Sequence, residues 1–178
     1  YVLPFNRMPS ERNLNRTSGE SFDWASFDLP DEAFGDGLAT DWAIKQLKDH
    51  PSDKPFFIGI GYYRPHIPLY APKKYFDLYP LESIQLPQVR SDDLDDIPEA
   101  GKKRALSAVT AGTHQNVIAY NQWKNAVQAY LACISFIDSQ IGELLDYLDN
   151  SPYAKNTIIV FFSDHGWHLG EKQAWGKF

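Results

Sequence analysis

The chain has 178 residues, of which 43% are hydrophobic and 15% aromatic, and its formal net charge is −6. These values favour a folded domain over a disordered chain, and the negative balance gives no general attraction for nucleic acid or an anionic membrane surface. The single cysteine excludes an internal disulfide and a multi-cysteine metal site. No apolar run reaches the roughly 18–20 residues of a spanning helix, so we expect no membrane segment and one domain, residues 1–178.

The first half of the chain predicts one helix and one buried strand. Residues 1–37 are polar and broken by Pro, Gly, Ser and Asn, which predicts an irregular lead-in. Residues 38–49 carry apolar side chains about every four positions, which predicts a short amphipathic helix that ends before Pro51. Residues 56–63 are apolar without alternation, as expected of a strand covered on both faces in a parallel sheet. The prolines of residues 64–75 predict a stiff, extended loop.

The second half predicts a long helix and a second strand. Residues 80–116 are irregular, and their acidic run at 91–96 is expected to be a solvated loop, since it lacks the Gly and the final Glu of a calcium loop. Residues 121–149 repeat apolar side chains every three or four positions, which predicts one long helix packed on a core. Cys133 lies on this helix and is expected to be a packed structural thiol. Residues 157–162 predict a second fully buried strand.

The order of these elements predicts an α/β fold in which helices flank a mostly parallel sheet. In such sheets, ligands bind beyond the carboxyl ends of the strands. Arg64 and His66 follow the first predicted strand, and Asp164, His165 and Trp167 follow the second. If the strands are parallel, both groups lie on one rim of one sheet. Roughly ninety residues separate the two strands, more than a minimal crossover needs, so we expect either an insertion or further strands from sequence outside the chain.

The residue types at this rim leave its chemistry open. His66 lies between two prolines, and a stiff loop suits a preorganised catalytic imidazole as well as a plain surface loop. Asp164 closely follows an apolar run, where a carboxylate is costly unless it is paired, bound to a metal or caps a helix. Lys177 is suited to hold an anion as a mobile point charge, although a single Lys is more often a plain surface residue.

Three blocks of the chain resemble the iduronate-2-sulfatase branch of the type I sulfatases, which belong to the alkaline phosphatase superfamily. They are GYYRPHIPLYAPKKYFDLYP, YLACISFIDSQIGELLDYLD and TIIVFFSDHGWHLGEKQAWGK, and they keep the order and spacing of that family. The resemblance covers residues 38–178 and implies a partial sulfatase catalytic domain. It also implies the fold of that superfamily, an alkaline-phosphatase-like sandwich with a mostly parallel sheet flanked by helices.

The resemblance implies a catalytic role or a metal-binding role for four residues. Asp164 and His165 match the second pair of calcium ligands in the family, so calcium is the implied cofactor, completed by residues outside this chain. His66 matches the histidine that contacts the sulfate ester and can act on the leaving oxygen. Lys177 matches the lysine that binds the sulfate. An imidazole ligand is atypical for calcium, which prefers oxygen, so the role of His165 depends on the resemblance alone.

The resemblance also implies a sulfated sugar or glycosaminoglycan as the substrate. Trp167 matches a residue that lines the sugar pocket of the family. Arg64 stands where relatives often have Lys, one position before a proline, and is the second residue expected to bind the substrate. The sequence does not identify the sugar, and nothing in it indicates an oligomeric state.

The nucleophile expected of a sulfatase is missing from the chain. The family uses a formylglycine made within a Cys/Ser-x-Pro-x-Arg motif, and no such motif occurs in the sequence. The first calcium-binding acids of the family are absent as well, and residues 1–10 lack the basic and apolar regions of a signal peptide. We therefore expect an internal fragment that is inactive alone. The parent enzyme is expected to be exported, to the bacterial periplasm or outside the cell, or lysosomal.

Two alternatives to a calcium-dependent sulfatase remain open at this point. The first is a phosphate- or phosphonate-ester hydrolase of the same superfamily, with an unmodified Thr or Ser nucleophile and more His and Asp ligands for zinc. The second is a noncatalytic sugar-binding or scaffolding relative. The sequence upstream of this chain discriminates among the three, because it carries or lacks the formylglycine motif.

Overall fold

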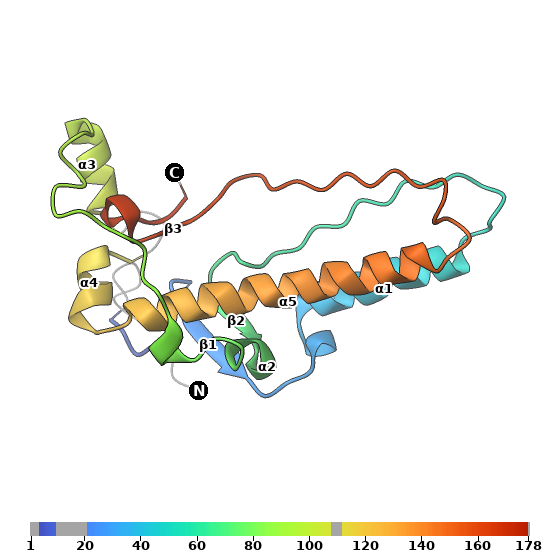
Figure 1. Ribbon diagram of the computed structural model, residues 1–178, viewed down its shortest axis with the longest axis horizontal. Helices are drawn as coiled ribbons and strands as arrows, with labels where there is room; N and C mark the ends of the chain where they lie inside the picture. Colours follow the sequence, from blue (N-terminus) through green and yellow to red (C-terminus); the bar gives the residue numbers. More distant parts are fainter. Residues whose placement is uncertain (1–3, 10–20, 108–111, 178) are drawn as a thin grey trace.

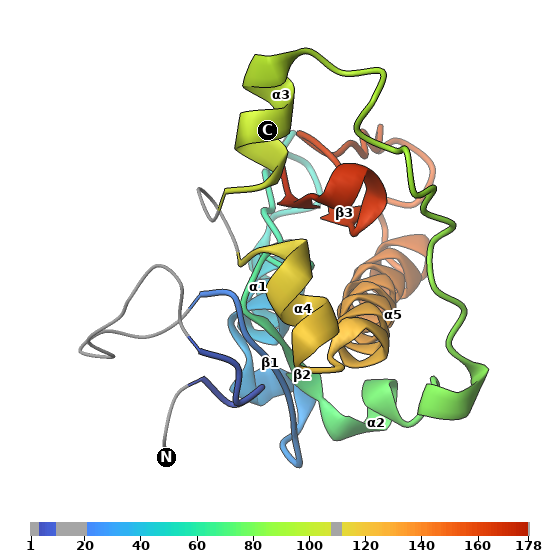
Figure 2. The same cartoon turned by 90° about the vertical axis from the view of Figure 1, so that its left-hand side faces the viewer.

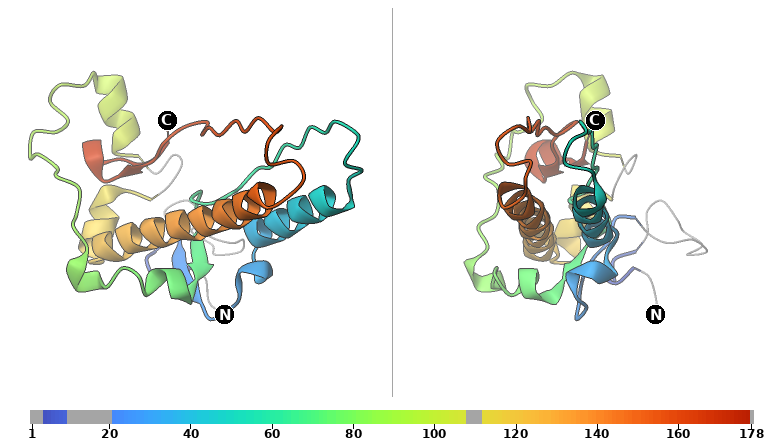
Figure 3. Two further views of the ribbon diagram at one scale, coloured as in Figure 1. Left: turned by 45° about the vertical axis from the view of Figure 1, so that its right-hand side comes forward. Right: turned by 90° about the vertical axis from the view of Figure 1, so that its right-hand side faces the viewer.

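Two packed helices form the centre of the computed structural model, which describes residues 4–9, 21–107 and 112–177. Helices α1 (Gly35–Asp49) and α5 (Trp123–Asp149) lie side by side along the long axis of the molecule (Figures 1 and 3). Among these residues, no helix combines the length and the apolar content that crossing a membrane requires.

A parallel pair of strands packs against α5 on one side (Figure 1). Strand β1 (Trp24–Phe27) pairs with β2 (Leu69–Pro72), and the side chains of Leu69 and Ala71 are almost completely buried. The fold is therefore α/β with a parallel sheet flanked by helices, which confirms the predicted fold class. The strands of that sheet are not the predicted ones. Strand β2 has prolines at both ends and is followed at once by a helix. Because prolines are rare within strands, the sequence predicted a stiff loop where this short strand lies.

The expected irregular lead-in, residues 1–37, is only partly correct. Residues 1–3 and 10–20 lie outside the described part of the chain. Residues 21–37 contain β1, the 3₁₀ turn η1 (Asp31–Ala33) and the first turn of α1. A strand of four residues carries too little periodicity to be recognised, and its partner β2 lies more than forty positions away.

The long helix α5 is confirmed, but its most buried face differs from the predicted one. Ala126, Ala129 and Ala132 are completely buried and, together with Phe136, belong to the core that includes β1 and β2. Ile134, which the periodicity assigned to the apolar face, is 41% exposed. The small alanine side chains let the helix approach β2 closely, so the tightest packing occurs where the sequence is least bulky.

Helix α1 begins three residues earlier than predicted, at Gly35. Its buried face carries Ala43, Ile44 and Leu47, whereas Trp42, expected to face the core, is 51% exposed. Leu38, the other end of the predicted apolar face, is 57% exposed. The helix was therefore predicted correctly, but two of its apolar residues were assigned to the wrong side.

Replacing Gly37 with Ala is expected to destabilise the chain by about 1–3 kcal/mol. A Cβ atom at this position would lie 2.2 Å from the carbonyl oxygen of Asp31 and 2.7 Å from its carbon, both backbone atoms that cannot move without shifting η1. Urea unfolding of the variant checks the value. Gly35→Ala is the matched control, because no atom lies within 4 Å of a Cβ there, and an equal loss in both variants would contradict the close approach.

Short elements occupy the end of the molecule that faces the viewer in Figure 2, where α3 (Glu99–Ala105), α4 (His114–Ala119) and β3 (His168–Leu169) lie. The expected irregular stretch 80–116 contains α3 and the start of α4, and its residues 108–111 lie outside the described part. The remaining elements are α2 (Lys73–Phe76), η2 (Leu81–Ser83), η3 (Glu171–Gln173) and β4 (Trp175–Gly176).

The segment 56–63, predicted as a strand buried on both faces, is extended but belongs to no sheet within the described residues. Its side chains alternate: Phe56 and Ile58 pack on a cluster that includes Leu47 and Leu148, whereas Phe57 is 96% exposed. Period-two alternation is that of a strand with one covered face. The prediction of burial on both faces is therefore wrong, because the helices cover this segment from one side only.

The second predicted strand, residues 157–162, is also extended, but its side chains are exposed at every position from 158 to 162. It runs in the same direction as 56–63, on the side of the helices opposite β1 and β2 (Figures 1 and 3). Ile158 is 91% exposed and Phe162 is 81% exposed, so the prediction of a fully buried strand is wrong. Within the described part of the chain, no backbone–backbone hydrogen bond joins residues 56–62 or 157–162 to another segment. Their N–H and C=O groups therefore have no strand to pair with here.

Backbone amides of residues 57–62 and 158–162 are expected to exchange with solvent at nearly unprotected rates in this chain. Amides in the middle of α5 should exchange at least about 10³-fold more slowly, because their hydrogen bonds break only when the core unfolds. Hydrogen–deuterium exchange read by mass spectrometry compares the three segments in one sample. Strong protection of the two extended segments in a monomeric chain would contradict the observed lack of partners.

Candidate functional site

The loop that follows residues 56–63 holds His66 in a constrained setting. Nδ1 of His66 lies 2.7 Å from the carbonyl oxygen of Ile67, and its ring lies 4.7 Å from the ring of Tyr63, measured between centroids. The peptide bonds before Pro65 and Pro68 are both cis. A carbonyl oxygen only accepts hydrogen bonds, so Nδ1 carries the proton of this contact and Nε2 is the nitrogen left for other partners.

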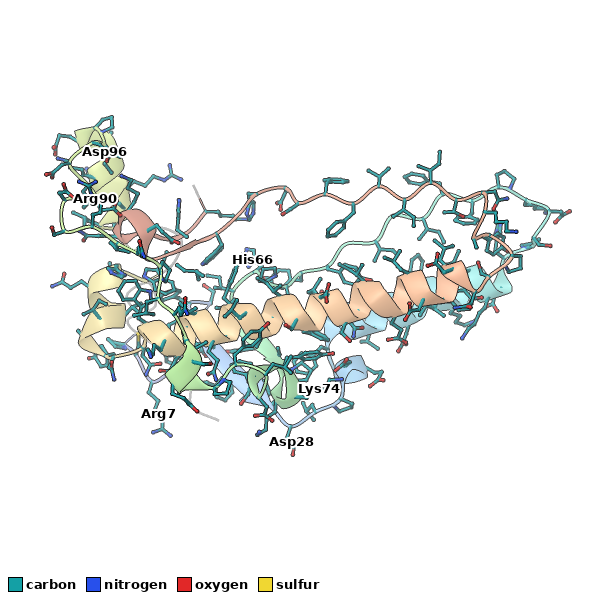
Figure 4. The ribbon with its side chains drawn as sticks, in the orientation of Figure 1. Arg7, Asp28, His66, Lys74, Arg90 and Asp96 are labelled. Atoms are coloured by element: carbon teal, nitrogen blue, oxygen red, sulfur yellow. The ribbon has the colours of Figure 1, made fainter. Side chains whose placement is uncertain are left out.

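The structure brings His66 together with Trp167, a residue one hundred positions later in the chain. The centroids of the two rings lie 6.0 Å apart at an interplanar angle of 58°. Figure 4 shows His66 above the α5 ribbon, near the end of the two extended segments. The loops that follow the two extended segments therefore meet, as the argument from strand ends expects, although the segments themselves form no sheet within the described residues.

Lys177 directly follows the β3–β4 hairpin. His168 of that hairpin pairs with Gly176 in antiparallel register, so Trp167 and Lys177 adjoin the same end of the hairpin. Trp175 is 3% exposed and belongs to the main core, so the hairpin is anchored to the body of the domain.

Asp164 and His165 lie in the exposed turn between the second extended segment and β3. The carboxylate of Asp164 is 81% exposed, and its Oδ2 lies 3.3 Å from Nε2 of His165. Nδ1 of His165 lies 2.8 Å from the carbonyl oxygen of Gly166, so it donates there. Nε2 and the Asp164 carboxylate face each other, an arrangement that suits either a proton on Nε2 or a bound cation. A backbone carbonyl that holds the other ring nitrogen is also the usual support of a metal-binding histidine.

These two side chains supply only part of a metal site. Calcium takes six to eight ligands. Across residues 4–9, 21–107 and 112–177, no group of three or more His, Cys, Asp or Glu side chains is arranged to bind a metal ion. The donor chemistry of Asp164 and His165 thus fits a cation whose other ligands come from elsewhere.

Arg64, expected to bind the substrate, contacts its own loop. Its Nε donates to the carbonyl oxygen of Tyr70 at 2.8 Å, and its guanidinium lies 5.1 Å from the centroid of the Tyr63 ring. These contacts tie the loop to β2. The contacts with substrate stay a prediction, and the structure adds a second role, support of the loop that carries His66.

The sequence argument gave no role to the residues that anchor this loop to α1. Oδ1 of Asp36 accepts a hydrogen bond from the backbone N–H of Tyr63 at 2.6 Å, and Oγ1 of Thr40 lies 3.1 Å from the hydroxyl of Tyr62. Asp36 is only 5% exposed. A signal was available, since Asp36 and Thr40 stand on the same helical face as Ala43, and a carboxylate on a buried face needs a donor.

The acidic run at 91–96, expected to be a solvated loop, docks on the turn after β3. Nζ of Lys172 bonds Oδ1 of Asp96 at 2.6 Å and the carbonyl oxygen of Asp93 at 2.7 Å, and the backbone N–H of Lys172 donates to Oδ2 of Asp93. The expectation of a solvated loop is therefore wrong for Asp93, whose side chain is 16% exposed, whereas Asp96 is 72% exposed and stays in solvent while it pairs with Lys172. From its position in the sequence, Lys172 is expected to be a solvated charge. In the structure it binds Asp93 and Asp96, so these carboxylates already have a cationic partner.

Cys133 is the packed structural thiol that the sequence predicts. It is completely buried within α5, and burial raises the pKa of its thiol to about 12. A thiol in this state is a poor nucleophile at neutral pH, so Cys133 does not take the place of the missing formylglycine.

Stability is expected to fall as the pH drops below about 6.5, in part because of His114. Burial lowers the pKa of His114, although the nearby Glu171 carboxylate opposes this, and Nδ1 of His114 accepts a bond from Nε1 of Trp175 at 3.0 Å. The unfolded chain therefore takes up a proton at a higher pH than the folded chain, so stability is full above the unfolded pKa and declines below it. Urea unfolding between pH 5 and 8 should show a shallower decline in His114→Gln. An identical slope in both proteins would contradict this contribution.

Comparison with known proteins supplies the family of this chain. Residues 10–178 match the sequence model of the family described as Sulfatase. A sulfatase of Formosa agariphila is 49% identical over 155 residues, which cover 87% of this chain and 30% of that protein. Human iduronate 2-sulfatase is 37% identical over 160 residues, covering 85% of this chain and 29% of that protein.

A more distant relative has a broader name. The multifunctional alkaline phosphatase superfamily protein of Trinickia caryophylli is 28% identical over 157 residues, covering 84% of this chain and 30% of that protein. The chain spans 30% or less of the length of these curated relatives. Because the family model matches almost all of the sequence and keeps the loops that carry His66, Asp164 and His165 within the match, the chain belongs to the Sulfatase family.

Proposed function

We propose that the chain is part of an enzyme that hydrolyses sulfate esters of sugars, with the ester held between the His66 loop and the 164–177 segment. The observation that carries this proposal is the approach of His66 to Trp167, 6.0 Å between ring centroids, from segments far apart in sequence. An imidazole beside an indole offers a proton donor next to a surface on which a sugar ring can pack.

Each residue of the site has a chemical task in this proposal. A sulfate monoester is an anion whose leaving oxygen gains negative charge as the bond to sulfur breaks, so the site needs fixed positive charge and a proton donor. Lys177 holds the sulfate as a point charge. His66 gives a proton to the leaving oxygen through Nε2, and Trp167 with Arg64 orients the sugar.

Asp164 and His165 hold the calcium ion in this proposal, with the remaining ligands outside the described residues. When bound, calcium supplies positive charge against the nonbridging oxygens of the sulfate. The nucleophile, a formylglycine, belongs to a part of the protein that this chain does not contain. The 178-residue chain is accordingly expected to show no turnover of any sulfate ester.

Iduronate 2-sulfate units of a glycosaminoglycan are the substrate that we propose first. The support is the 37% identity to human iduronate 2-sulfatase over most of this chain. The parent protein is then exported or located in the lysosome, because such glycans are degraded outside the cytoplasm. The similarity to the multifunctional protein of Trinickia caryophylli favours one runner-up, a phosphate- or phosphonate-ester hydrolase of the same superfamily.

Steady-state kinetics of the full-length protein test these proposals. The substrates are 4-nitrophenyl sulfate, 4-nitrophenyl phosphate, a phenylphosphonate monoester and heparan disaccharides sulfated either at iduronate O2 or at glucosamine O6. We expect kcat/KM to be highest for the iduronate 2-sulfate, and to fall after calcium is removed with a chelator. Higher kcat/KM for the phosphorus esters than for every sulfate ester would replace the proposal by the runner-up.

A further inference from the structure

We propose that Tyr63 and Asp36 are positioning residues that hold His66 in its Nδ1–H form, so that Nε2 is the nitrogen that exchanges a proton with the substrate. This inference rests on the proposed function for its catalytic consequence. The tautomer itself follows from contacts within the described residues and is measurable without turnover.

The carbonyl oxygen of Ile67 is the centre of the arrangement. It receives Nδ1 of His66 at 2.7 Å and the hydroxyl of Tyr63 at 3.0 Å. A carbonyl oxygen has two lone pairs and no proton to give, so both partners must donate and both lone pairs are used. In the other neutral tautomer, Nδ1 has a lone pair instead of a proton. Two acceptors, Nδ1 and the Ile67 oxygen, would then face each other at this distance, which is unfavourable.

The ring of Tyr63 restrains the imidazole from a second direction. The two ring centroids lie 4.7 Å apart at an angle of 36°, close enough for face contact. One side chain therefore limits both the hydrogen bond of His66 and the tilt of its ring. The Trp167 ring, 6.0 Å away, adds a contact from the segment that follows the second extended run.

Asp36 connects Tyr63 to helix α1, a rigid element. Its buried carboxylate accepts the backbone N–H of Tyr63 at 2.6 Å, and one turn later on α1 the hydroxyl of Thr40 meets that of Tyr62 at 3.1 Å. Helix α1 is packed against α5. The loop that carries His66 is thus held by two neighbouring points of a packed helix, which is the support that a precisely oriented catalytic group needs.

The proton balance of the proposed step follows from this geometry. His66 enters as the imidazolium with protons on both nitrogens. The bond between sulfur and the leaving oxygen breaks and its electron pair stays on that oxygen, while the sulfuryl group would be taken up by an already deprotonated nucleophile oxygen outside this chain. The Nε2 proton moves to the leaving oxygen, and His66 is left neutral in the Nδ1–H form that Ile67 and Tyr63 favour.

The tautomer is tested by ¹⁵N NMR of the full-length protein labelled with ¹⁵N-histidine, at a pH where the histidines are neutral. Loss of signals in His66→Gln identifies the His66 ring. We expect its Nδ1 to resonate as a protonated nitrogen and its Nε2 as an unprotonated one. His114 is an internal reference of the opposite kind, because its Nδ1 accepts from Trp175. A dominant Nε2–H form of His66 would overturn the proposal whatever the activity of the enzyme.

Variants separate positioning from folding. Tyr63→Leu and Asp36→Ala are expected to lower kcat about 10- to 100-fold with little change in KM, and to give His66 signals averaged between two tautomers. Tyr63→Phe and Asp36→Asn should restore part of kcat, because they keep the ring contact and an acceptor for the Tyr63 N–H. Tyr120→Leu, at an exposed tyrosine at the end of α4, is the matched control.

Each outcome decides the proposal. Unchanged kcat and an unchanged His66 spectrum in Tyr63→Leu would overturn it. Thermal unfolding of each variant is measured in parallel, and if Asp36→Ala does not fold, the pair Tyr63→Leu and Tyr63→Phe carries the test alone. If the wild type shows the Nδ1–H form while His66→Gln keeps full activity, the proposed function fails at His66 and the catalytic half of this inference fails with it.

Discussion

Replacing His66 with Gln in the full-length protein is expected to lower kcat on a sulfate ester by about 10²–10⁴-fold. Gln keeps a polar side chain of similar length but has no proton to give to a leaving oxygen. The bond from Nδ1 to Ile67 shows that the imidazole is already oriented, so its loss removes a prepared proton donor as well as a proton. KM should change much less than kcat, because the transfer occurs only in the transition state.

The leaving group supplies a sharper version of this measurement. A substrate with an acidic leaving group, such as 4-nitrophenyl sulfate, needs less protonation than a sugar alcohol, so the loss in kcat should be larger for the sugar sulfate. His50→Gln is the matched control, since His50 contacts the Lys54 carbonyl at the far end of α1. An equal loss for both substrates would rule out proton donation by His66.

Replacing Asp23 with Ala is expected to lower the free energy of unfolding by about 3–5 kcal/mol, which is large for one substitution. The carboxylate of Asp23 is completely buried. It accepts bonds from the backbone N–H groups of Phe5, Asn6 and Trp24, each at 2.8 Å, and from the hydroxyl of Tyr70 at 2.6 Å. Without it, buried donors on the N-terminal segment and on both strands lose a charged acceptor.

Urea unfolding of the variant and the wild type measures this loss. Asp28→Ala is the matched control, because Asp28 lies exposed after β1 (Figure 4) and such a change should cost no more than about 0.5 kcal/mol. Asp23→Asn should fall between the two, since its amide oxygen keeps an acceptor but loses the charge. A loss below about 1 kcal/mol in Asp23→Ala would contradict the idea that this carboxylate joins the N-terminal segment to the sheet.

The parts of the fold that the sequence predicted well are those with a long local period. Helix α5 repeats its apolar side chains over 27 residues, and the long helix was predicted to within two residues at its start. Burial on that helix was predicted less well, because Ile134 has the character of a core residue and Ala129 does not, yet Ala129 is the buried one. Which face of a helix is covered depends on how closely its neighbour can approach.

The parts that the sequence could not predict are those with a distant partner. Strand β1 exists because β2 lies beside it, and each has only four residues. In contrast, residues 157–162 have every local property of a buried strand and are exposed here, because no strand lies beside them within the described residues. Strand pairing is a property of two segments, so one segment alone cannot reveal it.

The candidate site divides in the same way. The order of residues was enough to select His66, Trp167, Asp164, His165 and Lys177 as candidates. The approach of the His66 ring to Trp167, the use of Arg64 to hold its own loop and the support from Asp36 are visible only in the folded chain.

The sequence by itself therefore determined which side chains are present at the ends of the two apolar runs, that residues 38–49 and 121–149 are helical, and that residues 56–63 and 157–162 are extended. Those properties come from residue type and from backbone geometry repeated within a few turns. The tertiary structure alone decided which faces are covered, which donors meet Asp23 and which nitrogen of His66 stays open. Most of these depend on hydrogen bonds and contacts between segments many residues apart, which a local sequence pattern cannot predict.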